Sequence, residues 1–143
     1  MVQNVNPTFV KTPNVTVTQL TTTIGANAVL VNCYSGGPNG SKIVGLAFTA
    51  QSSVAQDVRL AIVSSASITG FFNTVSIPIN SGFVSGTLPT NGFTGAQVPV
   101  DSDGNPYLIL NSSAASLQIS TTILSSQWSS GNEVTLIVTA GDF

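Results

Sequence analysis

The clearest pattern of hydrophobic and polar positions lies in residues 42–64, where two apolar runs flank a polar turn. Apolar side chains occupy every second position in both runs: Val44, Leu46 and Phe48 in the first, and Val58, Leu60 and Ile62 in the second. A period of two places each set on one face of a β-strand. The connecting residues 51–56 are too few for a helix, so the pattern predicts a β-hairpin whose inner face forms the centre of a core.

Shorter segments with β-branched or alternating apolar residues follow along the chain, separated by clusters of Gly, Asn, Ser and Pro that favour turns. Pro78 should mark either the end of its strand or an edge strand, because proline has no N–H to donate to a sheet. Further strands are predicted over residues 14–23, 28–34, 71–79, 107–110, 117–124 and 133–139. About seven to nine short strands predict an all-β fold, either a single antiparallel β-sandwich or a jelly-roll-like barrel.

Two segments depart from the strand pattern. Residues 1–13 predict an extended N-terminal arm ahead of a sandwich domain over residues 14–143, and residues 80–97, with several glycines, predict a long loop. Both carry apolar side chains, which we expect to dock on the domain itself or on a neighbour. The candidate interface residues are Val2, Val5, Phe9 and Val10 in the arm, and Phe83, Leu88 and Phe93 in the loop.

Charged residues make up only 6% of the chain, against a usual share of about 25%. Three basic residues and a net charge of −2 argue against binding to nucleic acid or to anionic membranes, both of which need clustered Lys and Arg. A surface of neutral polar groups is typical of a protein that is packed in an assembly, which is the favoured interpretation. The alternative is a secreted domain with a Ser/Thr-rich face. The N-terminus does not resemble a signal peptide, so we expect synthesis in the cytoplasm without export.

Catalytic chemistry is hard to build from this chain. It has no His and one cysteine, Cys33, which we expect to be a small buried hydrophobe. We therefore predict no enzymatic activity and no cofactor. Asp101 and Asp103, in the sequence DSDGN, resemble the start of a calcium loop, but the Glu of a full EF-hand loop is replaced by Ser112. A hairpin turn is the favoured interpretation, with a calcium site as the alternative.

Four segments, in this order and spacing, carry a resemblance to a known group: NGSKIVGLAFTA (39–50), AQDVRLAIV (55–63), VPVDSDGNPYLIL (98–110) and EVTLIVTAGDF (133–143). They resemble small tailed-bacteriophage virion proteins of the capsid decoration, or cement, type. The resemblance implies a β-rich protein on the exterior of the virion. It also implies binding to the major capsid protein, often as a homotrimer, where the protein clamps neighbouring capsomers.

Two other functions fit the pattern of strands. A tail-tube or fibre component would form rings or polymers rather than a small closed oligomer. A carbohydrate-binding module would use exposed aromatic side chains, for which the candidates are Trp128, Tyr34 and Tyr107.

Overall fold

The computed structural model describes residues 12–20, 30–111, 116–121 and 133–143, which form nine β-strands and no helix. The strands are β1 (Thr12–Leu20), β2 (Val31–Ser35), β3 (Ser41–Gln51), β4 (Gln56–Val63), β5 (Thr69–Ile77), β6 (Thr90–Asn91), β7 (Leu108–Leu110), β8 (Ser116–Thr121) and β9 (Glu133–Asp142). The predicted strands are present, with shifted ends. Of the predicted arm, Thr12 and Pro13 belong to β1, and residues 1–11 lie outside the described part of the chain.

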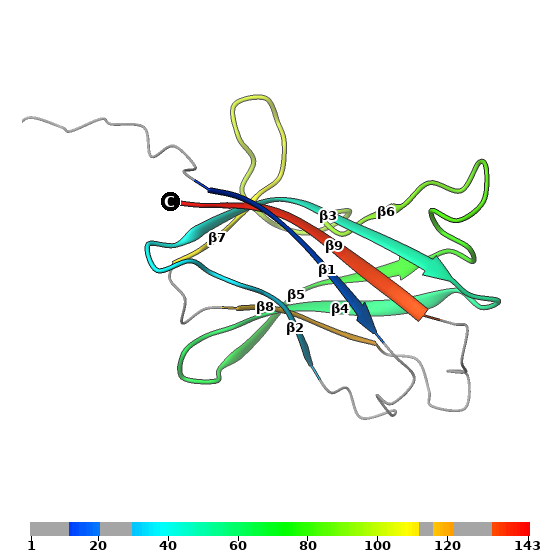
Figure 1. Ribbon diagram of the computed structural model, residues 1–143, viewed down its shortest axis with the longest axis horizontal. Coiled ribbons are helices and arrows are strands. Elements are labelled where there is room, and N and C mark those ends of the chain that lie inside the picture. The colour runs from blue at the N-terminus through cyan, green and yellow to red at the C-terminus, as the bar shows by residue number, and fades with distance from the viewer. Residues whose placement is uncertain (1–11, 21–29, 112–115, 122–132) are drawn as a thin grey trace, which may run out of the picture.

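The strands form two antiparallel sheets packed face to face, as Figure 1 shows. Sheet A has the order β1-β9-β3-β6, with β7 also paired to β3, and sheet B has the order β2-β8-β4-β5. The pairs are nested: β4 pairs with β5, β3 with β6 and β7, β2 with β8, and β1 with β9. This is a long antiparallel hairpin rolled over on itself, the strand order of a jelly roll. The predicted fold class is confirmed.

The predicted hairpin over residues 42–64 is wrong in its pairing. Strand β3 lies in sheet A and β4 in sheet B, so the two runs face each other across the core and are not hydrogen-bonded neighbours. The expected inner face is nevertheless the centre of the core, since Phe48, Val58 and Leu60 are all fully buried. The alternation of apolar and polar residues shows which side chains face inward, but not which strand is the hydrogen-bonded neighbour. Two strands in stacked sheets therefore have the same alternation as the two strands of a hairpin.

Val44 also departs from the sequence prediction, because its side chain is 50% exposed. The pairing of β3 with β9 shifts register between Ile43 and Gly45, so Val44 is the extra residue of a β-bulge. A bulge inserts one residue and resets which side chains face inward. Ile43 and Leu46 are therefore buried on either side of it, and strict alternation places Val44 on the wrong face.

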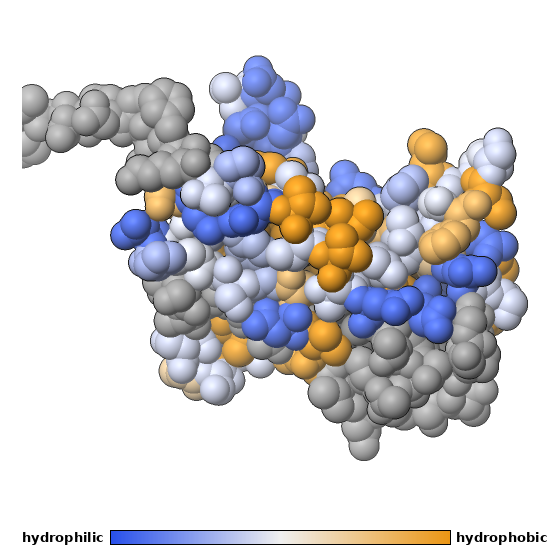
Figure 2. Space-filling view, viewed as in Figure 1, coloured by the Kyte–Doolittle hydropathy of each residue, from blue (hydrophilic) through white to orange (hydrophobic). Residues whose placement is uncertain are grey.

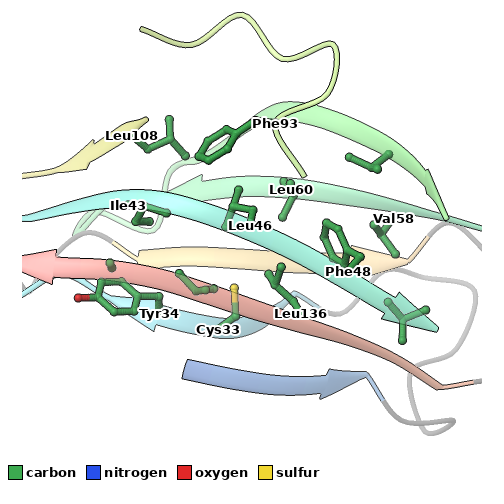
Figure 3. Close-up of a cluster of buried hydrophobic side chains, with 14 of the residues drawn as sticks. Cys33, Tyr34, Ile43, Leu46, Phe48, Val58, Leu60, Phe93, Leu108 and Leu136 are labelled. Carbon is green, nitrogen blue, oxygen red and sulfur yellow. The ribbon is translucent and has the colours of Figure 1, made fainter. Parts of the chain in front are cut away.

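The core lies between the sheets, where apolar side chains from both layers interdigitate (Figure 3). Cys33 and the adjacent Tyr34 both face inward, because β2 has a register shift between Asn32 and Tyr34. Burial raises the pKa of the Cys33 thiol to about 12, which confirms that this cysteine is a buried, weakly reactive side chain. Strand β5 ends at Ile77, directly before Pro78, as predicted.

A polar cluster closes one end of the sandwich around Asp142 at the end of β9. Its Oδ1 accepts hydrogen bonds from Ser41 Oγ (2.5 Å) and Tyr34 Oη (2.6 Å), and its Oδ2 accepts one from Asn14 Nδ2 (2.7 Å). Gly37 N donates to Ser41 Oγ (2.7 Å). The cluster joins β1, β2, β3 and β9, and so ties an edge strand of sheet B to sheet A.

These hydrogen bonds, from Ser41 first and then Tyr34 and Asn14, hold the pKa of Asp142 below its ordinary value of 3.8. Because the folded-state pKa is depressed, the contribution of Asp142 to stability is complete above the unfolded pKa and is lost as the pH falls through the folded-state value. We expect Asp142→Asn to lower the free energy of unfolding at pH 7 by roughly 1–2 kcal/mol, the scale of hydrogen bonds to a charged group at a partly exposed site. Urea unfolding measures this loss.

The matched control is Asp103→Asn, at an exposed turn position. The stability difference between Asp142→Asn and the wild type should shrink below pH 4, where Asp142 becomes protonated first in the unfolded chain and then, at lower pH, in the folded protein. A difference that stays constant between pH 7 and pH 2.5 would show that the charge of Asp142 does not hold the cluster.

Candidate interaction surface

The segment between β5 and β6 is held in place by one buried hydroxyl group. Ser81 is fully buried, and its Oγ lies 3.0 Å from both Leu88 O and Thr90 Oγ1. Its carbonyl oxygen accepts a hydrogen bond from Ala50 N (2.9 Å) in β3. The two ends of this segment are therefore fixed to sheet A by hydrogen bonds.

Glycine is required at one position of the same segment. Gly82 has a φ of +75°, and a Cβ atom there would lie 2.8 Å from Thr49 Cγ2. Its N–H donates to Thr87 O (2.8 Å), which closes the loop between them. The positive φ and the close approach both favour glycine, so the loop has a defined shape.

This loop displays apolar side chains to solvent. The exposed fractions are 81% for Leu88, 55% for Phe83 and 48% for Val84. We call these three residues the apolar tip. Exposed apolar side chains that are gathered on one ordered loop indicate a contact surface.

Phe93 differs in burial from Phe83 and Leu88, although the sequence predicts all three as interface residues. It is 5% exposed and belongs to the core cluster (Figure 3). Phe93 and Ser81 thus anchor the predicted loop, whereas Phe83 and Leu88 do not. Phe93 therefore packs in the core and is not displayed to solvent as Phe83 and Leu88 are. The remaining interface candidates, Val2, Val5, Phe9 and Val10, lie outside the described residues.

A groove of about 500 Å³ opens on the outer face of sheet A. Strands β3 and β9 supply one part of its lining, and the segments after β5 and before β7 supply the rest. The lining residues are Val44, Gly45, Leu46, Ala47, Pro89, Asn91, Phe93, Asp101, Asn105, Pro106, Ile137 and Thr139. A groove of this size is within the range of small-molecule sites. No periodic pattern in the sequence could predict it, because its lining comes from four separate segments.

The outer face of sheet A around this groove is unusually apolar. Val15 and Val17 of β1 are each 66% exposed and are paired in register with Thr139 and Ile137 of β9. Figure 2 shows apolar side chains gathered over β1 and β9 in the middle of this face. Among the described residues of sheet A, charges occur only toward the strand ends, at Lys42, Glu133 and Asp142, so the middle of the face is uncharged.

The DSDGN sequence forms the turn that was favoured over a calcium site. Asp101 Oδ1 accepts hydrogen bonds from the backbone N–H groups of Asp103 (3.0 Å) and Asn105 (2.9 Å), and Gly104 adopts a φ of +83°. These bonds, that from Asn105 first, hold the pKa of Asp101 below its ordinary value. Within the described ranges, no three His, Cys, Asp or Glu residues are grouped as metal ligands.

The two described aromatic residues proposed for carbohydrate binding, Tyr34 and Tyr107, do not form a shared exposed surface. Tyr34 is 6% exposed in the core, and the ammonium group of Lys42 lies over the ring of Tyr107, 4.6 Å from its centroid. Trp128 lies outside the described residues. Burial of Tyr34 removes it from any exposed groove.

Comparisons with known proteins show only a weak structural similarity. No protein-family model and no curated protein match the chain. Among solved structures, the chain is similar to that of infectious bursal disease virus Gt strain, with 15% identity, a TM-score of 0.33, and coverage of 99% of this chain and 38% of the other. A second is the VP2 subviral particle of the same virus, with 14% identity, a TM-score of 0.26, and coverage of 98% and 44%.

The chain thus spans less than half the length of those two viral proteins, and similarity at this level does not assign a function. The jelly-roll fold rests on the strand order itself. No helix suited by length and apolar character to crossing a membrane occurs in the described part of the chain.

The geometry of the DSDGN turn predicts no response to calcium. Asp101 already accepts two backbone hydrogen bonds, so an ion would have to compete with them. We expect the melting temperature to be the same in EDTA and in millimolar calcium chloride. Asp101→Ala should lower it slightly in both buffers, since the turn loses these hydrogen bonds. A calcium-dependent rise that Asp101→Ala abolishes would restore the calcium site.

Proposed function

We propose that this protein is a structural component of a virus particle, and specifically a capsid decoration protein that binds the exterior of a phage head. The observation that carries the proposal is the apolar tip, Phe83, Val84 and Leu88, on a loop fixed by Ser81. An ordered loop loses little conformational entropy on binding, so more of the energy of apolar burial contributes to affinity.

The low charge of the chain supports the same role. Charged groups are costly to remove from water, whereas the apolar tip and the middle of sheet A can be covered at small desolvation cost. A decoration protein stabilises a shell by burying surface between subunits. It needs no catalytic group, and the resembled family works in this way.

The residues that carry the resemblance occupy defined places in the fold. The segment 39–50 spans β3 and the turn before it, 98–110 spans the DSDGN turn and β7, and 133–143 spans β9. Jelly rolls occur in virus capsid proteins and also in lectins and cupins, so the fold alone does not choose among these roles. The partner that the resemblance implies is the major capsid protein, with the decoration protein arranged as a homotrimer.

The apolar tip gives the test of this proposal. Burial of a leucine side chain contributes about 1.5–3 kcal/mol, so Leu88→Ser should weaken binding to heads by tenfold or more per chain. Phe83→Ser combined with Leu88→Ser should remove the protein from purified particles. Occupancy is measured by quantitative gel analysis of particles that are incubated with a dilution series of each variant.

Ile68→Ser is the matched control. Ile68 is 70% exposed, in the turn between β4 and β5, and does not belong to the apolar tip. It should bind heads as the wild type does, and all variants should keep the wild-type melting temperature. Full occupancy by the Phe83→Ser and Leu88→Ser double variant would refute the role of the tip.

A further inference from the structure

The groove on sheet A lies at a break in the edge of that sheet. On the side away from β9, residues Ser41–Ile43 of β3 pair with β7, and Ala47–Phe48 pair with β6. The intervening Val44–Leu46 line the groove, and Gly92 N donates to Leu46 O (2.8 Å) at its margin. An extended peptide beside Val44 would fill this break, as in strand addition to a sheet edge.

We propose that the groove binds the N-terminal segment, residues 1–11, of a second copy of this chain, with Phe9 and Val10 as the anchoring side chains. The contact is head to tail, because the donor segment and the acceptor groove are different surfaces. Such contacts close into a ring when the rotation between copies allows it.

The chemistry of the segment matches that of the groove. Among residues 1–11, Lys11 carries the only charged side chain, and among the groove-lining residues Asp101 is the only charged one. The Asp101 carboxylate is ionised at neutral pH, because its pKa is lowered from an ordinary value that is already acidic. An aromatic side chain is a frequent anchor at interfaces, and Phe9 supplies one next to the β-branched Val10.

The direction of β1 favours the groove of a second copy over the chain's own groove. Thr12 is paired with Asp142, which is paired with Ser41, so β1 begins at the level of Ser41. The groove begins three residues further along β3, at Val44, which is roughly 10 Å in the opposite direction. Pro13 restricts Thr12 to an extended conformation.

A reversal near Thr12 is also disfavoured by sequence. Residues 8–11 are Thr-Phe-Val-Lys, and the first turn-favouring pair on the N-terminal side is Asn6-Pro7. The sequence therefore favours a segment that continues away from its own groove, with the groove of a second copy as its site.

Disulfide trapping between two full-length variants tests the proposal. Phe9→Cys and Ala47→Cys chains, with different tags, are mixed and oxidised. Ala47 lies on the outer face of sheet A and is only partly buried, so its replacement spares the core. Cys33 is buried and should not compete. We expect a disulfide-linked heterodimer that forms at least tenfold faster than in a mixture of Phe9→Cys and Ile68→Cys, because docking raises the effective concentration of the two thiols.

Three results would overturn the proposal. Equal rates with Ala47→Cys and Ile68→Cys would show random collision. A monomeric intramolecular disulfide in the Phe9→Cys and Ala47→Cys double variant, without linked dimers in the mixture, would place the segment in its own groove. No linkage to Ala47→Cys or to the second groove position, Thr139→Cys, would leave the groove without this occupant. Thr139 is exposed, so this second variant keeps the test valid if Ala47→Cys does not fold.

Discussion

The nested pairing of the first half of the chain with the second half is the constraint on which the rest of this structure depends. Every connection except the one between β4 and β5 joins strands that are not hydrogen-bonded to each other, so most backbone groups find their partners far along the sequence. The pair β1 and β9 closes the roll, and the cluster around Asp142 joins this closure to β2 and β3. Closing such long loops costs chain entropy, and the hydrogen bonds of the Asp142 cluster help to offset this cost where β1 pairs with β9.

The sequence predicted the strands well and their pairing poorly, for physical reasons. Alternation records whether a side chain faces inward, and it placed Phe48, Val58 and Leu60 in the core correctly. It does not record which strand is the neighbour, so β3 and β4 looked like a hairpin. It also failed where a bulge resets the phase, as at Val44, because a bulge is fixed by pairing with β9 rather than by local composition.

The sequence identified the loop that carries the apolar tip, but not how its side chains are placed. The loop over residues 80–97 could be identified from its glycines, but the roles of its apolar residues could not. Phe93 is turned into the core, whereas Phe83 and Leu88 face solvent because Ser81 fixes the loop from inside. The groove had no sequence signal. Together, the apolar tip and the groove give one subunit two surfaces: we assign the tip to the shell and the groove to a neighbouring copy.

The most direct test of this account is the native mass of the full-length protein, measured by light scattering over a range of concentrations. The account predicts a small closed oligomer, with three copies of the 14.6 kDa chain as the expected species. Its mass should stay constant as concentration rises, because a closed ring has no free groove. A strict monomer at all concentrations would contradict the head-to-tail contact, and open-ended growth into polymers would contradict a decoration protein and favour a tail component.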